Sequence, residues 1–206
     1  MSSSSPPTTF VSASNPPTPL EVVKLKTALV VIDLQKGIAQ FPTAPYDSKT
    51  VVANAARLAD AFRKNNMTVF LVHVVMGDAD RLKPVSDASF QMRGPPQNDW
   101  AEFMPEIGPR ESDIIITKKQ WGAFYGTELE LQMRRRGLDT IVLCGISTIY
   151  GVESTARFAY EYGFQLIFAE DAMGAQTAEA HNNSVNYVFK RMGRVRSTQE
   201  ILDALE

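Results

Sequence analysis

The sequence predicts an α/β protein: a three-layer α/β/α, Rossmann-like fold with a central parallel sheet of about six strands. Short apolar runs alternate along the chain with segments whose apolar residues recur at helical spacing, which is typical of strand–helix–strand units. The apolar runs are continuous, as expected for strands that helices cover on both faces. Helices that connect parallel strands make right-handed crossovers, so this alternation predicts one parallel sheet between two helical layers.

Each predicted element follows from one of these two patterns. Continuous apolar runs such as TALVVID and MTVFLVHVV predict six strands, over 27–33, 67–75, 113–118, 139–145, 165–171 and 193–196. Apolar residues at helical spacing predict five helices, over 49–64, 126–136, 151–163, 177–192 and 198–205. Glycines at the ends of two of these helices, Gly137 and Gly163, are typical stop signals.

One domain, residues 21–206, is expected to contain all of these elements, because a chain of 206 residues suits a single sizeable core. Residues 1–20 are rich in Ser, Thr and Pro and are interpreted as a disordered tail. The segment 76–112 carries five prolines, too many for regular structure throughout. Irregular segments of this length in compact domains are usually functional or disordered.

Composition and charge argue against several functional classes. A net charge of -2, with acidic and basic residues spread along the chain, argues against a nucleic-acid or membrane surface. No apolar run approaches the roughly 20 residues that span a bilayer. The N-terminus has neither the basic nor the apolar region of a secretory signal, so a cytoplasmic location is expected.

The candidate metal ligands are few. The single cysteine, Cys144, rules out an internal disulfide and a cysteine-based zinc site, and it is interpreted as a buried, inert thiol. His73 and His181 lie more than a hundred residues apart, without the local spacing of a ligand pair. Both are interpreted as structural, and neither a metal nor a cofactor is predicted.

Three features lie at the carboxyl ends of predicted strands, where open α/β sheets bind their ligands. Asp33 ends the first strand, Lys118 ends the third, and the loop 145–151 follows the fourth. Taken alone, Asp33 would equally suit a turn cap and Lys118 a solvated position. If they share one crevice, they form a charge-coupled acid–base pair with mutually perturbed pKa values.

The loop 145–151, GISTIYG, leads into a predicted helix. Unpaired N–H groups at the start of a helix favour negative charge, so this loop suits a carboxylate or a developing oxyanion. Gly151 permits close approach of the backbone to a ligand. The alternative is a tight strand-to-helix turn whose glycines are there for steric reasons only.

Three segments carry a resemblance to a known family: ALVVIDLQKGI, the region from ITKKQWGAFYGT to CGISTIYGVEST, and AEDAMGA. Their order and spacing over residues 25–205 resemble the isochorismatase-like hydrolase superfamily. Most of its members are cysteine hydrolases that use an Asp, a Lys and a Cys. The resemblance assigns the Asp to Asp33 and the Lys to Lys118, and it places the nucleophilic Cys at Gly151, which implies the subgroup that lacks the thiol.

The resemblance also implies the surroundings of the site. The backbone N–H near Ser147 would contribute to an oxyanion hole, together with Gly151, and a cis peptide is expected between Ile146 and Ser147. Phe41, Trp121 and Tyr150 are expected to line the substrate pocket, although Trp121 would equally suit core packing. Family members commonly form dimers or tetramers, so a homo-oligomer is expected.

The glycine at position 151 changes the expected chemistry, because a thioester mechanism needs a thiolate. True isochorismatases resemble this chain in having Gly at that position, and they hydrolyse a vinyl ether and release pyruvate. Asp33 would then be the general acid, while Lys118 would orient it and bind a substrate carboxylate. A neighbouring ammonium lowers a carboxyl pKa and burial raises it, and the sequence leaves open which effect is larger.

Two alternatives to this small-molecule hydrolase stay open at the sequence level. One is a non-catalytic family member that binds a small carboxylate or a partner, and the other is an amidase of nicotinamidase type that uses Cys144 or a loop hydroxyl. The pocket differs from both known branches. Isochorismatases have the sequence GVYAHxG in this loop, where this chain has GISTIYG, and the glutamine that follows their second strand has no counterpart here. The zinc ligands of nicotinamidases have no counterpart in this chain either.

Overall fold

The structure, a computed structural model, describes residues 19–75, 82, 84–88 and 98–206. It contains a six-stranded parallel sheet with the strand order β3-β2-β1-β4-β5-β6. The strands are β1 (Thr27–Ile32), β2 (Thr68–Val74), β3 (Ile114–Lys118), β4 (Thr140–Ile146), β5 (Gln165–Gly174) and β6 (Arg194–Arg196). The predicted three-layer α/β/α class with about six parallel strands is therefore confirmed.

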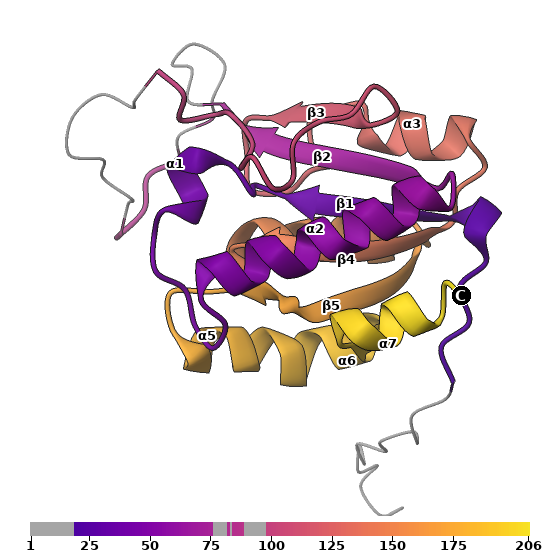
Figure 1. Cartoon of the computed structure of the whole chain (residues 1–206). Helices are drawn as coiled ribbons and strands as arrows, with labels where there is room; N and C mark the ends of the chain where they lie inside the picture. The colour runs from indigo at the N-terminus through magenta and orange to yellow at the C-terminus, as the bar shows by residue number, and fades with distance from the viewer. Residues whose placement is uncertain (1–18, 76–81, 83, 89–97) are drawn as a thin grey trace, which may run out of the picture.

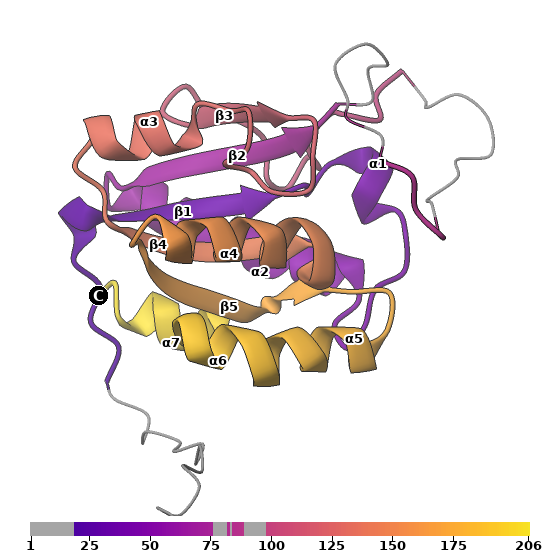
Figure 2. The same cartoon turned by 180° about the vertical axis from the view of Figure 1, so that it is seen from behind.

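The helices cover both faces of this sheet. They are α1 (Lys36–Ala39), α2 (Ser48–Lys64), α3 (Leu129–Arg135), α4 (Glu153–Glu161), α5 (Ala178–Asn183), α6 (Lys190–Met192) and α7 (Thr198–Asp203). Figure 1 shows α2 and α7 on one face, and Figure 2 shows α3, α4 and α6 on the other. Two buried apolar clusters, one on each face, fill the spaces between the layers.

The burial of the strands explains why their sequences are continuous apolar runs. All six residues of β1 are buried, because β1 lies in the middle of the sheet with helices on both sides. By contrast, β3 is an edge strand, and its Ile115 is 38% exposed. The continuous apolar run in DIIITK predicts a strand that is covered on both faces, whereas the position of β3 at the edge of the sheet leaves part of it open to solvent.

Helix α2 shows how local sequence signals produce one covering layer. Its apolar residues recur at helical spacing and face the sheet. The side chain of Asp47 accepts a hydrogen bond from the N–H of Thr50 at 2.8 Å and so caps the helix start. Just past its end, Asn66 takes a left-handed conformation with φ 55°, which turns the chain into β2.

Two predicted helices differ from the structure because each contains a π-helical segment. The predicted helix 151–163 begins instead with η2 (Thr148–Val152), from which α4 continues. The predicted helix 177–192 is α5, then η3 (Ser184–Phe189), then α6. A π turn adds one residue to the turn without changing the apolar spacing enough to be seen in a sequence, and such turns are frequent at functional sites.

Short elements escaped prediction because they offer too few residues for a period to be recognised. These are α1 and the 3-10 turn η1 (Lys24–Lys26). Residues 1–18 of the predicted tail, and residues 76–81, 83 and 89–97 of the predicted irregular segment, lie outside the described residues. The described part from 98 to 112 contains turns, irregular chain and one isolated antiparallel bridge, between Phe103 and Gln35, but no helix or strand. No helix among the described residues is long and apolar enough to cross a membrane.

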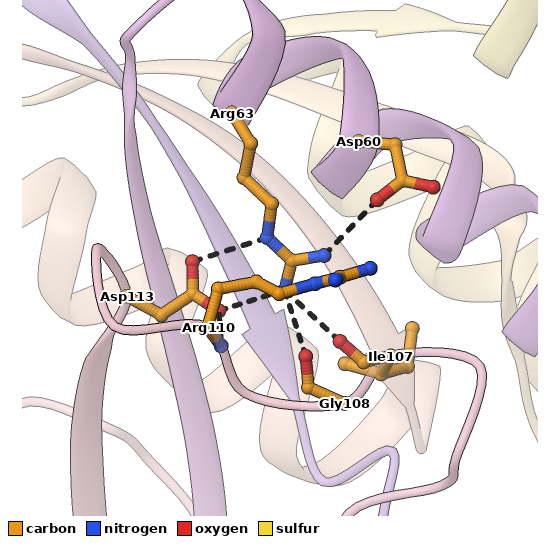
Figure 3. Close-up of polar contacts among 6 residues, drawn as sticks. All are labelled: Asp60, Arg63, Ile107, Gly108, Arg110 and Asp113. Carbon is orange, nitrogen blue, oxygen red and sulfur yellow. Dashed lines mark hydrogen bonds and ion pairs between the residues drawn. The ribbon is translucent and has the colours of Figure 1, made fainter.

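A buried ion pair anchors the end of this segment to α2, as Figure 3 shows. The guanidinium group of Arg63 donates to both carboxylate oxygens of Asp113, at 3.1 and 2.7 Å. It also donates to the backbone carbonyls of Ile107 and Gly108. The backbone N–H of Arg110 donates to Asp113 Oδ2 at 2.8 Å. These bonds hold the chain just before β3, at the amino end of that strand.

Candidate active site

The structure brings Asp33 and Lys118 together at the carboxyl ends of the strands. Asp33 directly follows β1 and Lys118 is the last residue of β3, so β2 lies between the two strands that carry them. Lys118 Nζ lies 2.8 Å from Asp33 Oδ2, and the two side chains are 3% and 7% exposed. The residues that the sequence singled out at two strand ends therefore form one buried ion pair.

Burial outweighs the lysine in setting the acidity of Asp33. Removal of the carboxyl group from water raises the pKa of Asp33 above its ordinary value of 3.8. The charge and the hydrogen bond of Lys118 lower the pKa, and so does an electrostatic interaction with His73, but together they have the smaller effect. Burial therefore has a larger effect on the pKa than the neighbouring ammonium has, and this carboxyl group holds its proton more tightly than an exposed aspartate does.

The two carboxylate oxygens of Asp33 differ in their surroundings. Oδ2 contacts Lys118, whereas Oδ1 is buried and has no hydrogen-bond partner within the described residues. Lys118 Nζ also donates to the carbonyl of Gln120 at 3.1 Å. Because buried polar atoms in proteins nearly always have partners, an oxygen without one is a position where a ligand or a proton is expected.

The backbone at Asp33 is unusual as well. Its φ angle is 53°, in the left-handed region that few residues other than glycine adopt, although Asp tolerates it better than most. Its N–H donates to the carbonyl of Val72 at 2.9 Å, which ties this turn to the neighbouring strand. Such conformations persist only where the surrounding structure enforces them, and they cluster at functional sites.

The loop after β4 lies beside Asp33. β1 and β4 are the neighbouring strands at which the strand order reverses, which is where open α/β sheets bind ligands. The Ile146–Ser147 peptide is cis, as the family resemblance implied. Gly145 has φ 125°, and a Cβ atom there would lie 2.1 Å from the carbonyl oxygen of Ile32, so only glycine fits.

Gly151 lies close to the ion pair. A Cβ atom built on Gly151 would lie 2.9 Å from Ile32 Cγ2, 3.2 Å from Asp33 Oδ2 and 3.4 Å from the carbonyl oxygen of Trp121. The first of these distances requires a neighbour to move. A side chain at position 151 would therefore project against Ile32 and Asp33, and glycine avoids this crowding.

Thr155, which the sequence reasoning missed, fixes the position of Gly151. Its buried hydroxyl donates to the carbonyl of Gly151 at 2.6 Å and accepts a hydrogen bond from the N–H of Ala123 at 3.0 Å. This joins the loop after β4 to the segment that follows Lys118. Thr155 is the third residue of α4, and a threonine there has no distinctive sequence signal, because a side-chain bond to the carbonyl four residues earlier is common in helices.

The predicted aromatic residues occupy different places. The rings of Trp121 and Tyr150 lie 4.8 Å apart and are 59% and 37% exposed. Because Tyr150 directly precedes Gly151, this pair lies next to the loop and the ion pair. Phe41 lies just past α1 and is 44% exposed, so its contribution to a pocket stays a prediction.

Gln35 is a second residue that sequence reasoning missed. Its buried side chain accepts from the N–H of Val74 at 2.8 Å and donates to the carbonyls of Val74 and Trp100 at 3.0 and 3.2 Å. Trp100 in turn covers Gly37, where a Cβ atom would collide with the indole ring. Gln35 thus fastens the segment around Trp100 across the carboxyl ends of β1 and β2.

Cys144 and His73 lie in surroundings that suit structural roles. Cys144 is fully buried on β4, and burial raises the pKa of its thiol, with a smaller contribution from the charge of Asp171. His73 Nδ1 lies 2.9 Å from the carbonyl of Ala101, and its Nε2 lies 2.8 Å from Thr117 Oγ1. Among the described residues there is no group of three or more His, Cys, Asp or Glu side chains that could hold a metal ion.

Comparisons with known proteins agree on one family. Residues 27–200 match the model of the isochorismatase domain. The chain is 54% identical over 188 residues to the uncharacterized isochorismatase family protein YecD of Escherichia coli O157:H7, covering 90% of this chain and all of that protein. It is 52% identical over 184 residues to the uncharacterized isochorismatase family protein YwoC of Bacillus subtilis (strain 168), covering 88% and 95%.

A solved structure supports the same relationship. An isochorismatase family protein from Burkholderia thailandensis superposes with a TM-score of 0.84 at 38% sequence identity. The match covers 90% of this chain and 98% of that structure. The likeness therefore extends over most of both chains.

Proposed function

Because the chain belongs to the isochorismatase family and is a hydrolase, we propose that it hydrolyses a small carboxylated vinyl ether of the isochorismate type without a nucleophilic side chain. Asp33 is the general acid in this proposal. One observation carries it: Asp33 is a buried acid whose pKa is raised, with Lys118 on one oxygen and no hydrogen-bond partner on the other within the described residues. This is the arrangement that a proton donor needs.

The proposed reaction begins with proton transfer from Asp33 to carbon. The carboxyl group donates its proton to the terminal methylene carbon of the enol ether, which becomes a methyl group, and the positive charge is shared between the adjacent carbon and the ether oxygen. Water adds to that carbon and its proton returns to the Asp33 carboxylate. The resulting hemiketal loses the alcohol, so that one water is consumed and pyruvate and an alcohol are released.

Lys118 has two roles in this proposal. Its ammonium group orients the Asp33 carboxyl through Oδ2, which leaves Oδ1 as the oxygen that carries the proton. It also provides positive charge for the carboxylate of the substrate, in a buried position where such attraction is stronger than in water. Ser147 and Gly151 are proposed to contribute backbone N–H groups to the same anion, with the aromatic pair Trp121 and Tyr150 as a wall of the pocket.

Position 151 supports a mechanism without a covalent intermediate. Gly151 offers no nucleophile, and the backbone there is already close to Ile32 and Asp33. Cys144 does not replace the missing thiol, because it is fully buried on β4 and its raised pKa disfavours the thiolate. An amidase of nicotinamidase type is therefore the less supported alternative.

A non-catalytic role as a binder of small carboxylates or of a partner protein is the other alternative. A binder of anions gains from a lysine but gains nothing from a carboxyl group placed against it. The close pairing of Asp33 with Lys118, at 2.8 Å and almost without exposure, thus favours proton transfer over simple binding.

The test is a panel of substrates with the purified protein. The panel contains isochorismate, nicotinamide and carbamoyl amides, and it is run on wild type, Asp33→Asn and Cys144→Ala. We expect pyruvate release from isochorismate by wild type and by Cys144→Ala, and its loss in Asp33→Asn. Asp139→Asn is the matched control, because this carboxylate lies just before β4, at the amino ends of the strands and thus at the opposite end of the sheet from the site.

The possible outcomes separate the three functions. Release of ammonia from an amide that disappears in Cys144→Ala would support the amidase. Turnover that survives in Asp33→Asn would contradict the acid role. If no compound is turned over but isochorismate or pyruvate binds to wild type in calorimetry, and Lys118→Met abolishes that binding, the non-catalytic binder replaces the proposal.

A further inference from the structure

A fully buried histidine lies behind the loop 147–151, on the side away from solvent. His181 comes from α5, which packs against η2. Its Nδ1 lies 3.0 Å from Thr148 Oγ1, and both side chains have 0% exposure. On the other side of the ring, Nε2 lies 3.8 Å from Glu170 Oε2 and has no hydrogen-bond partner within the described residues. The sequence indicated only a structural histidine.

Glu170 makes the orientation of this histidine definite. Its contact with His181 is the largest reason why the pKa of Glu170 lies below its ordinary value, and a hydrogen bond from the hydroxyl of Tyr46, at 3.1 Å, also lowers that pKa. The carboxylate is therefore ionised and can only accept. The 3.8 Å separation is too long for a direct hydrogen bond, so the attraction to Nε2–H is electrostatic.

The surroundings of the two ring nitrogens of His181 determine which of them carries the hydrogen. In a neutral imidazole one nitrogen donates and the other accepts. Since Nε2 faces a carboxylate, it keeps its hydrogen, and Nδ1 accepts the hydrogen bond from the hydroxyl of Thr148. The Tyr46 ring, edge-on to the imidazole at 5.9 Å, holds the ring plane from a third side.

Thr148 transmits this arrangement to the active site. It is the first residue of η2, directly after the cis peptide and three residues before Gly151. At the far end of the same turn, Gly151 lies so close to the ion pair that a Cβ atom on it would be 3.2 Å from Asp33 Oδ2. A displacement of Thr148 would therefore change how tightly the loop covers Asp33.

We propose that His181, oriented by Glu170, is a positioning residue that holds the loop 147–151 against Asp33 through the hydroxyl of Thr148. Thr148 is not itself a nucleophile, because its side chain is fully buried. The kinetic meaning of this inference rests on the proposed function, but its structural content does not. Loosening the loop would admit water to Asp33, and water would lower the raised pKa of that carboxyl group toward its ordinary value.

The test compares two substitutions at one residue. Thr148→Val removes the hydroxyl and keeps the shape, whereas Thr148→Ser keeps the hydroxyl. Thr198→Val is the matched control: Thr198 is equally buried and its hydroxyl donates to Asp171 at 2.7 Å, but at the start of α7, away from the loop. The titration of Asp33 is followed by NMR of carboxyl carbon, with the signal assigned by its loss in Asp33→Asn.

We expect the Asp33 pKa to fall in Thr148→Val and to stay at the wild-type value in Thr148→Ser and Thr198→Val. On a substrate that the wild type turns over, kcat of Thr148→Val should fall about tenfold with little change in KM, since a small misplacement costs catalysis more than binding. His181→Phe should lower the Asp33 pKa as Thr148→Val does, and the double variant should lower it no further.

The NMR chemical shifts of the two imidazole nitrogens of His181 test the inference without any measurement of activity. The chain has only two histidines, so the signals are assigned with one variant. The neutral tautomer with hydrogen on Nε2 is expected, and a neutral tautomer with hydrogen on Nδ1 alone would overturn the inference. So would a Thr148→Val variant with unchanged Asp33 titration, or equal effects of Thr148→Ser or Thr198→Val. If no compound is turned over, the proposed function fails while these spectra still decide the role of His181.

Discussion

Strand β3 separates two buried ion pairs of opposite character. Asp113, just before the strand, pairs with Arg63, and Lys118, at its end, pairs with Asp33. The shortest nitrogen–oxygen distances are nearly equal, 2.7 and 2.8 Å, and the aspartate side chains are 0% and 7% exposed. By distance and burial the two pairs look alike.

The difference lies in the remaining hydrogen-bonding capacity. Both oxygens of Asp113 are occupied, one of them by Arg63 and by the backbone N–H of Arg110 together. Asp33 Oδ1 has no hydrogen-bond partner within the described residues. A saturated pair can only hold the chain together, whereas an unsaturated pair keeps a polar atom available for a proton or a ligand. The two pairs are therefore expected to respond oppositely to substitution.

Among the proposed substitutions, Asp33→Asn should have the largest effect, and the property affected should be activity. We expect kcat/KM for the substrate of the wild type to fall by up to about 10⁴-fold, because the amide cannot supply a proton. The unfolding transition in urea should shift little, since Asn still offers an oxygen to Lys118. A variant that keeps activity, or one that unfolds at much lower urea concentration, would show that this pair is structural like the other.

Arg63→Met should give the reverse result. Removal of the guanidinium group leaves the buried Asp113 carboxylate without its partner, and breaking such a pair costs about 3–5 kcal/mol of the free energy of unfolding. Urea denaturation measures this loss. In conditions where the variant is folded, kcat/KM should stay within about threefold of wild type. A loss of activity as large as that of Asp33→Asn would remove the distinction between the pairs.

Gly151→Ala should have an intermediate effect, confined to the unsaturated pair. The added methyl group would lie 2.9 Å from Ile32 Cγ2 and 3.2 Å from Asp33 Oδ2, and overpacking of this kind costs about 1–3 kcal/mol. We expect a lower urea midpoint together with a lower kcat. Gly163→Ala, with open space around its Cβ position but a φ of 79°, serves as the control for a purely backbone effect on stability. Activity equal to wild type in Gly151→Ala would mean that the loop has room to move.

The smallest effect is expected in the pH dependence of stability. The folded-state pKa of Asp33 is raised, so the folded protein binds this proton more tightly than the unfolded chain. The contribution of Asp33 is thus fully present below its unfolded pKa and is lost as the pH rises through its folded pKa. Asp33→Asn lacks this loss, so the free energy of unfolding of the variant, relative to that of wild type, should rise as the pH increases from the unfolded value of 3.8 through the folded pKa. A constant difference across that range would contradict the raised pKa.

Much of the fold was predictable because its signals are local. Strand positions followed from continuous apolar runs, and the observed bounds differ from the prediction by one residue at one end of β1 and at both ends of β2. The parallel sheet followed from the alternation of strands and helices. The positions of Asp33 and Lys118 at strand ends were also visible, because parallel strands bring their carboxyl ends to one edge.

The partners of buried polar groups were not predictable. Arg63 with Asp113 and Thr148 with His181 are 50 and 33 residues apart, and no pattern along the chain links them. The π-helical turn that contains Gly151 has no sequence signal that distinguishes it from the start of an ordinary helix. Each of these features arises from packing between elements that lie far apart in sequence.

The sequence by itself determined the fold class, the candidate acid and base and the absence of a thiol at Gly151, since apolar periodicity and residue identity are properties of the chain. Only the tertiary structure decided that burial outweighs Lys118 in raising the pKa of Asp33, and that one carboxylate oxygen lacks a hydrogen-bond partner within the described residues. The physical reason is that desolvation and hydrogen-bond satisfaction depend on every neighbour around a group, and those neighbours come from strands, loops and helices that meet only in the folded protein.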